Sequence, residues 1–273
     1  MKVYVGVSSG QDSAAALYKL LTETDHEIYA RNTRYRKLFS KTEMDFSESY
    51  TIRTMEWLKT NVRDFDFDIN DAYVPDWSLY MPEDQRKYTD VSKEVVEKYY
   101  NKFVPEHGVT ASGAIDTSGN KMPYIAFVME RFYNLTKHTK EMGADSLMTG
   151  HDSAQVNGST GATKEFIEEA YNISIDFPLG NMHRFEIYES IPKELREIVN
   201  PCDTWWQRNG ERHCGTCRKC LTRRIYNSHK YSIEELGNIW DEQVLNKQKD
   251  PKLGILVTGR ASAEYLVDYL KNL

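Results

Sequence analysis

A run of small and polar residues near the N-terminus has the residue types and the spacing of an anion-binding loop. It consists of Ser8, Ser9, Gly10, Gln11, Asp12 and Ser13. Small residues let the backbone turn closely around a ligand, and a helix that begins there directs its unpaired N–H groups and the positive end of its dipole at that ligand. Phosphate is the ligand that such a loop favours. Because no Gly-Lys-Ser/Thr triplet ends the run, it is not a Walker A loop. The alternative is an ordinary turn in which Asp12 or Ser9 only caps the helix.

All four cysteines lie close together in the C-terminal third of the chain, in a Cys-x11-Cys-x2-Cys-x2-Cys pattern. They are Cys202, Cys214, Cys217 and Cys220. In a cytosolic protein, four thiols at this spacing suit one tetrahedral Zn²⁺ whose role is structural, because a closed four-cysteine site has no open position. An iron–sulfur cluster is the rival, since it also takes four cysteines. Free thiols in a core are disfavoured because the surrounding sequence is polar.

The elements that must position these residues follow from the spacing of apolar residues. We expect strands at 2–7, 27–30, 64–69 and 144–149, a loop at 158–161, and helices at 14–21, 46–62, 122–140, 164–171 and 185–199, the last interrupted by Pro192. Strands that alternate with helices predict an α/β fold with a doubly wound parallel sheet. In such sheets, ligands bind beyond the carboxyl ends of the strands. The Ser8–Ser13 loop follows the first strand, and His151 and Asp152 follow the fourth, so both lie at that edge.

Composition narrows the class of protein. The chain has 273 residues, 40% of them hydrophobic, and a net charge of −6. This charge gives no indication of nucleic-acid binding. No run approaches the roughly 20 apolar residues of a membrane span, and no secretory signal is visible, so we expect a cytoplasmic protein. We predict three parts: an α/β domain over residues 1–200, a four-cysteine knuckle over 201–225 and a helical extension over 226–273.

The N-terminal loop resembles the signature of the PP-loop ATP pyrophosphatases, Ser-Gly-Gly-x-Asp-Ser, with Ser9 in place of one glycine. Enzymes of this superfamily cleave ATP between its α- and β-phosphates and transfer AMP to a carbonyl or carboxylate oxygen. The resemblance implies that Ser8–Ser13 bind the phosphates of ATP, that Mg²⁺ accompanies them, and that Asp12 orders this ion or only caps the helix. The basic segment 31–37 is either a solvated loop or a loop that reaches the nucleotide or an acidic substrate.

The loop and the cysteine pattern together resemble the 7-cyano-7-deazaguanine synthases of the queuosine pathway. Further matching positions are Gly150, Asp152, Pro178, Leu179, Arg184, Glu186, Ile187 and one of Arg223 and Arg224. These ligases use ATP and ammonia to convert the 7-carboxylate of a deazaguanine into a nitrile, and homodimers are common among them. The resemblance implies that the four cysteines bind zinc. It also implies that Arg184, which replaces a lysine, stabilises the departing pyrophosphate; the alternative is a surface arginine. Lys121 is a weaker candidate for the same role.

Two segments depart from that family. Residues 122–126 lack its Arg-Asn pair, and residues 157–163 lack its tyrosine, aspartate and arginine. In the family these positions face the substrate, so we expect an altered acceptor site, as in relatives found in phages and bacterial defence loci. The alternatives are an enzyme of the same superfamily that modifies a protein, a tRNA or a nucleobase, and a nucleotide-binding relative without catalysis. Thiolation of tRNA is disfavoured because the cysteine cluster leaves no spare cysteine.

Overall fold

The computed structural model describes residues 1–34, 41–72, 111–115, 121–156 and 159–200, together with single positions at 94, 223, 226, 227, 232, 234 and 235. All four cysteines lie outside the described residues. So does nearly all of the predicted knuckle and of the helical extension, so these boundaries remain predictions.

The centre of the fold is a five-stranded parallel sheet in the order β3-β2-β1-β6-β7. Its strands are β1 (Lys2–Val7), β2 (Glu27–Arg34), β3 (Asp66–Asp71), β6 (Ser146–Thr149) and β7 (Ser174–Asp176). The chain runs outward from β1 to β3 and then returns to the other side of β1, so the connection reverses between β1 and β6. This arrangement confirms the predicted doubly wound sheet and identifies the place where such sheets bind ligands.

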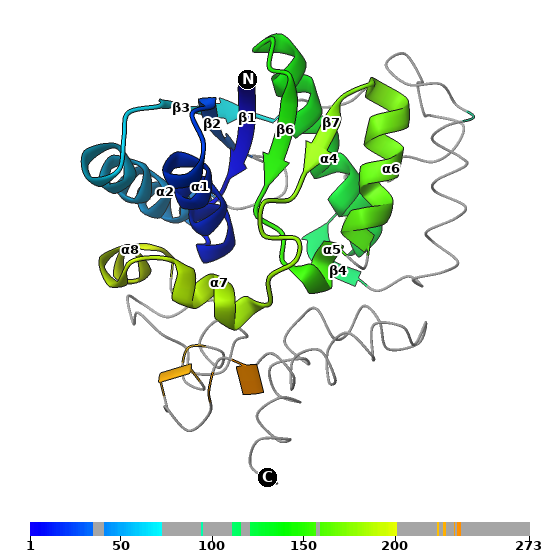
Figure 1. The fold of residues 1–273 in the computed structure, drawn as a ribbon. Coiled ribbons are helices and arrows are strands. Elements are labelled where there is room, and N and C mark those ends of the chain that lie inside the picture. Colours follow the sequence, from blue (N-terminus) through cyan, green and yellow to red (C-terminus); the bar gives the residue numbers. More distant parts are fainter. Residues whose placement is uncertain are drawn as a thin grey trace, which may run out of the picture.

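Helices cover both faces of this sheet and its carboxyl edge. The long ones are α1 (Gln11–Glu23), α2 (Lys41–Asn61), α4 (Tyr124–Glu141) and α6 (Ser159–Tyr171). The short ones are α5 (Ser153–Val156), α7 (Arg184–Ser190) and α8 (Lys193–Ile198), and a separate hairpin pairs β4 (Ala111–Ile115) with β5 (Lys121–Pro123). In Figure 1, α5 and α7 lie below the arrowheads of β1 and β6, at the carboxyl edge.

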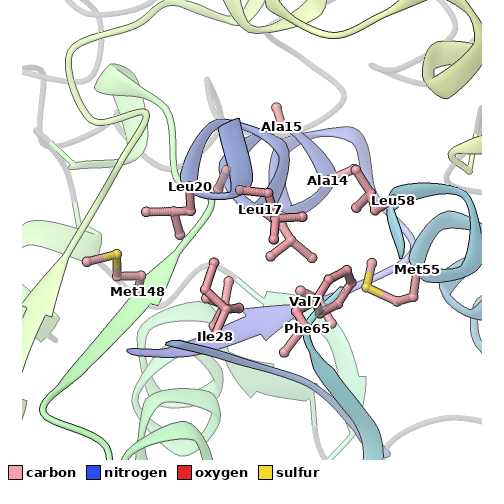
Figure 2. Close-up of a cluster of buried hydrophobic side chains, with 14 of the residues drawn as sticks. Val7, Ala14, Ala15, Leu17, Leu20, Ile28, Met55, Leu58, Phe65 and Met148 are labelled. Atoms are coloured by element: carbon pink, nitrogen blue, oxygen red, sulfur yellow. The ribbon is translucent and has the colours of Figure 1, made fainter. Parts of the chain in front are cut away.

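Alternation along β1 explains the two layers of the core. Val3, Val5 and Val7 belong to a buried cluster with α1, α2 and α7, whereas the intervening Tyr4 stacks on His138 of α4. Figure 2 shows the first layer, in which Leu17 of α1 lies near Val7. Successive side chains of a strand point to opposite faces, so a strand buried on both sides reads as continuously apolar. Met55 and Leu58 of α2 are buried in this first layer as well.

Two local expectations are wrong. The first four residues of the basic segment continue β2 rather than forming a loop, because each arginine has a partner: Arg31 lies 3.1 Å from Asp66, and Arg34 lies 2.6 Å from Glu48. Residues 159–161, expected in a loop, begin α6, which packs on α4. None of the described helices combines the length with the hydropathy that a transmembrane span requires.

Candidate functional site

The loop between β1 and α1 is held in shape by two of its own serines. The Ser13 hydroxyl oxygen accepts the Ser8 backbone N–H at 3.0 Å and lies 3.0 Å from the carbonyl oxygens of Ser8 and Gly10. Ser8 Oγ accepts the Gly10 N–H at 3.2 Å and lies 3.1 Å from Ser13 Oγ. The hydroxyls of Ser8 and Ser13 therefore bond within the loop, which leaves ligand binding to the backbone N–H groups and to Ser9.

The first turn of α1 has no side-chain cap. Gly10 is the N-cap residue in an extended conformation, and the first helical bond joins the Ala14 N–H to its carbonyl oxygen. The N–H groups that open a helix have no partner within it, and they carry the positive end of its dipole. This end of α1 therefore offers the donors that an anionic group requires.

Arg184 is buried at this edge and not exposed on the surface. Only 3% of it is accessible, against 1% of Asp152. Its Nη2 donates to Asp152 Oδ2 at 3.0 Å and to Asp12 Oδ2 at 3.2 Å, and its Nη1 lies 3.4 Å from Asp12 Oδ1. The structure thus brings together three residues that the sequence had singled out separately, and the alternative of a surface arginine is wrong.

The sheet explains why these residues meet. Asp12 follows β1 and Asp152 follows β6, and the two strands are parallel neighbours, so the segments after them lie side by side. Gly150 permits the contact: a Cβ atom at this position would lie 2.3 Å from the Asp12 carbonyl oxygen and 2.7 Å from the Ser13 nitrogen. Arg184 comes from a third element, as the first residue of α7, which packs on α1.

His183 caps the helix that carries Arg184. Its Nδ1 accepts the backbone N–H groups of Phe185 and Glu186 at 3.2 and 3.3 Å, and the Glu186 carboxylate accepts the His183 N–H at 2.9 Å. This reciprocal capping box fixes where α7 begins and hence where Arg184 emerges. Sequence reasoning missed His183, although an N-cap residue followed by glutamate three positions later is the signal of such a box.

The charges of Arg184 and of the two aspartates determine which ligands the site can bind. With both carboxylates ionised, Arg184 faces two negative groups, so a phosphate ligand needs additional positive charge. Carboxylate oxygens are ligands that Mg²⁺ accepts, in company with phosphate oxygens and water. Asp12 and Asp152 therefore fit a magnesium–phosphate complex. The described residues contain no group of three or more His, Cys, Asp or Glu that could hold a metal ion by themselves.

A second group of polar residues fastens the loop to its surroundings. Ser9 Oγ lies 3.1 Å from Ser47 Oγ of α2 and 3.3 Å from Asn200 Nδ2, while the Asn200 N–H donates to the Ser9 carbonyl oxygen at 2.8 Å. Asn32 Nδ2 donates to the Val7 carbonyl oxygen at 2.9 Å, at the end of β1. Sequence reasoning missed Ser47, Asn200 and Asn32, because isolated serines and asparagines carry no local signal of such contacts.

The remaining predicted residues take no part in this arrangement as described. His151 packs against Phe132 and Phe177, with Nδ1 2.7 Å from Thr149 Oγ1, which suits a structural role. Lys121 begins β5, and its side chain lies outside the description. Cys202, Cys214, Cys217 and Cys220 lie outside the described residues, so their metal site remains a prediction.

Comparisons with known proteins give weak likenesses. A scan against protein-family models finds no match, and a search of curated proteins finds none. Among solved structures, the chain is similar to the U34-tRNA thiolase NcsA from Methanococcus maripaludis with its 4Fe-4S cluster, at 12% identity and a TM-score of 0.38, over 84% of this chain and 71% of that one. It is similar to a predicted subunit of tRNA methyltransferase from Methanocaldococcus jannaschii, at 16% identity and a TM-score of 0.36, over 69% and 74%.

A third solved structure is a 4-thiouridine synthetase in complex with RNA and bound ATP, at 17% identity and a TM-score of 0.43. The match covers 78% of this chain and 44% of that one, so this chain spans less than half the length of the synthetase. Identities and TM-scores at this level do not carry an activity from those proteins to this chain.

Proposed function

We propose that this chain is an ATP-using enzyme of the PP-loop type, which releases pyrophosphate and transfers AMP to an acceptor oxygen. The observation that carries the proposal is the position of Arg184. A buried guanidinium reaches both Asp12 and Asp152 at the point where the strand order reverses, between β1 and β6, beside the uncapped N-terminus of α1. A preorganised cation at a helix N-terminus suits a site in which negative charge develops on a leaving group.

Each residue then has a role that its contacts support. The N–H groups at the start of α1 bind phosphate oxygens, and Ser8 and Ser13 keep the loop in the shape that presents them. Arg184 stabilises the charge that builds up on pyrophosphate. Asp12 and Asp152 hold Arg184 in place and offer oxygens to Mg²⁺, which would supply the remaining positive charge.

For the acceptor, we propose a carboxylate that is adenylated and then aminated. The carboxylate oxygen attacks the α-phosphorus, and the bond to the pyrophosphate oxygen breaks. Ammonia then attacks the acyl carbon, AMP leaves with the bonding electron pair, and an amide and a proton result. Support comes from the resemblance in the loop, in Gly150 and Asp152, and in the cysteine spacing. A second activation by ATP would convert the amide into a nitrile.

The test is to incubate the purified chain with ATP, Mg²⁺, ammonium and 7-carboxy-7-deazaguanine, and to follow the base by mass spectrometry together with pyrophosphate release. Formation of the amide or nitrile would establish the reaction. Asp12→Ala should abolish pyrophosphate release while the protein stays folded. Unchanged release by this variant would contradict the proposed site.

A different acceptor in the same type of reaction is the second candidate, and α6 favours it. Helix α6 begins at Ser159, within the segment 157–163 that faces the substrate in the deazaguanine enzymes. That segment lacks the family's tyrosine, aspartate and arginine and forms helix from Ser159 onward, so in this second candidate the acceptor is another carboxylate or carbonyl, on a tRNA, a protein or a nucleobase. AMP formation that requires cell extract and not the deazaguanine would select this candidate. ATP binding without pyrophosphate release under any condition would indicate a non-catalytic relative.

A further inference from the structure

We propose that the Ser9 hydroxyl is a phosphate-binding donor of the loop, set in place by Ser47 and Asn200. The inference rests on the proposed function, since it concerns the same loop and the same nucleotide. It assigns a binding role to a side chain at a position where the PP-loop signature has glycine, which has no side chain to donate.

The hydrogen bonds around Ser9 leave its proton available. Ser47 Oγ donates to Ser9 Oγ at 3.1 Å, and Asn200 Nδ2 donates to the same oxygen at 3.3 Å. A serine hydroxyl has two acceptor sites and one donor. Both acceptor sites are therefore occupied, and the described part of the chain provides no acceptor for the Ser9 proton.

The other two hydroxyls of the loop differ from Ser9 in this respect. Ser13 Oγ lies within hydrogen-bond distance of the carbonyl oxygens of Ser8 and Gly10, so its proton has acceptors inside the loop. Ser8 Oγ lies 3.1 Å from Ser13 Oγ, which can accept the Ser8 proton. Ser9 is thus the serine of this loop whose donor is left for a ligand.

The backbone holds Ser9 in one conformation without strain. Its carbonyl oxygen accepts the Asn200 N–H at 2.8 Å, and the residue is 7% exposed. Asn172 is the non-glycine residue with a positive φ among those described, so Ser9 has no need of the conformational freedom of glycine. A donor that is already fixed loses little rotational freedom when a ligand binds.

The chemistry of the site selects the class of ligand. Ser9 lies two residues before the uncapped first turn of α1, whose N–H groups favour an anion. An O–H group that donates to an anionic oxygen forms a shorter bond, about twice as strong as a neutral one. We therefore assign the Ser9 proton to a non-bridging oxygen of the β- or γ-phosphate.

The experiment is a calorimetric titration of the full-length protein with Mg-ATP, Mg-pyrophosphate and adenosine. Ser9→Ala should weaken the binding of Mg-ATP and of Mg-pyrophosphate about tenfold, the worth of one charge-assisted hydrogen bond, and leave adenosine unchanged. Ser9→Thr, which keeps the hydroxyl, should stay within about threefold of the wild type. Ser47→Ala should weaken pyrophosphate binding by a smaller factor, because it removes only the orientation of Ser9.

Ser49→Ala is the matched control, because Ser49 is an exposed serine of α2 whose hydroxyl donates to the Phe46 carbonyl oxygen, away from the loop. Thermal unfolding of each variant distinguishes a loss of binding from a loss of folding. If Ser9→Ala does not fold, the binding of pyrophosphate by Ser47→Ala is measured in its place. Equal loss of adenosine and pyrophosphate binding, or no loss of either, would overturn the inference while the proposed function stands. A wild-type protein that binds neither Mg-ATP nor pyrophosphate would overturn both.

Discussion

The guanidinium of Arg184 meets the carboxylate of Asp12 although 172 residues separate them in the chain. Two nitrogens of Arg184 approach two oxygens of Asp12, and Nη2 also bonds to Asp152. One buried cation thus connects α7 to the segments that follow β1 and β6. The ion pair between Arg184 and Asp12 therefore connects α7, late in the chain, to the loop between β1 and α1.

Replacement of Arg184 should affect both stability and activity. Arg184→Met leaves two carboxylates facing each other in a buried site, and breaking a buried ion pair by removing one partner costs about 3–5 kcal/mol. Urea unfolding should show a loss of that size, and pyrophosphate release should fall to background. Arg184→Lys should retain more of both, since it keeps the charge but has a single nitrogen for two carboxylates.

Arg53→Met is the control for Arg184→Met. Arg53 is an exposed arginine of α2 whose guanidinium lies 4.3 Å from the centre of the Tyr50 ring. An exposed cation–π contact is worth about 0.5–1 kcal/mol, so this variant should unfold within about 1 kcal/mol of the wild type. Equal stability of the Arg184→Met and Arg53→Met proteins would show that the buried pair contributes nothing.

Gly150 should not tolerate alanine. The added Cβ would lie 2.3 Å from the Asp12 carbonyl oxygen, and backbone at the start of a helix cannot shift cheaply. Overpacking of this kind costs about 1–3 kcal/mol, and it would move Asp12 away from Arg184. We expect Gly150→Ala to lower both the free energy of unfolding and the rate of pyrophosphate release.

Gly143→Ala is the control that separates a loss of stability from a loss of activity. Gly143 has a φ of 61° and no atom within 4 Å of an added Cβ, so alanine there strains only its own backbone. A cost of about 1–2 kcal/mol should follow, without loss of activity per folded molecule. If Gly150→Ala behaved like Gly143→Ala in the activity assay, the contact between residue 150 and α1 would have no bearing on the site.

The sequence predicted the parts of the fold that depend on local pattern. The first strand was predicted with its observed bounds, Lys2–Val7, because three valines alternate there between small and aromatic residues. The long amphipathic stretches on α2 and α4 were also recognised from their spacing. Other parts of the fold depend on contacts between residues that are distant in the sequence. Arg31 looked like part of a charged loop, but Asp66 on the neighbouring strand lets it be buried within β2.

The sequence predicts individual residues of the site but not the contacts between them. The Ser8–Ser13 loop and Asp152 each follow a strand, so their approach at one edge could be inferred from topology. The burial of Arg184 could not be inferred. Both of its partners lie more than thirty residues away, and no nearby residue indicates them. Asn200 and Ser47 reach Ser9 because α2 and α8 pack together, and no local sequence pattern predicts that packing.

His183 should position Arg184 through its cap on α7. His183→Leu removes the acceptor of two backbone N–H bonds and should cost about 1 kcal/mol of stability, together with a lower kcat for pyrophosphate release. His183→Asn can cap the helix through its own side-chain oxygen and should restore most of both. Recovery of stability without recovery of kcat would mean that the cap does not act through Arg184.

The cysteine cluster should bind one metal ion per chain. Elemental analysis of the purified protein is expected to give one zinc, because four closely spaced thiolates suit its tetrahedral geometry. Cys217→Ser should release the metal, whereas Ser49→Ala, at an exposed position of α2, is a control for handling. Iron together with visible absorbance would instead indicate an iron–sulfur cluster, and the zinc prediction would then be wrong.

Stability should depend on pH through His138. Burial among the side chains between β1 and α4 lowers the pKa of His138 below its ordinary value of 6.5, against the weaker opposing effects of Glu141 and of a hydrogen bond to the Asp71 backbone, and with a small contribution from Arg31 in the same direction. Its ring stacks on Tyr4, and Asn70 Nδ2 lies 3.4 Å from Nδ1. The folded protein therefore holds this histidine neutral where the unfolded chain would protonate it.

The sign of the effect follows from proton binding. Between the folded pKa and 6.5, the unfolded chain binds more protons, so the free energy of unfolding falls as the pH falls through 6.5 and is fully retained above it. Urea unfolding between pH 7.5 and 5.5 should show this decrease in the wild type and a smaller one in His138→Gln. His26→Gln, which alters a half-exposed histidine of the loop before β2, is the matched control. Identical pH dependence of the wild type and His138→Gln would exclude His138 as the source.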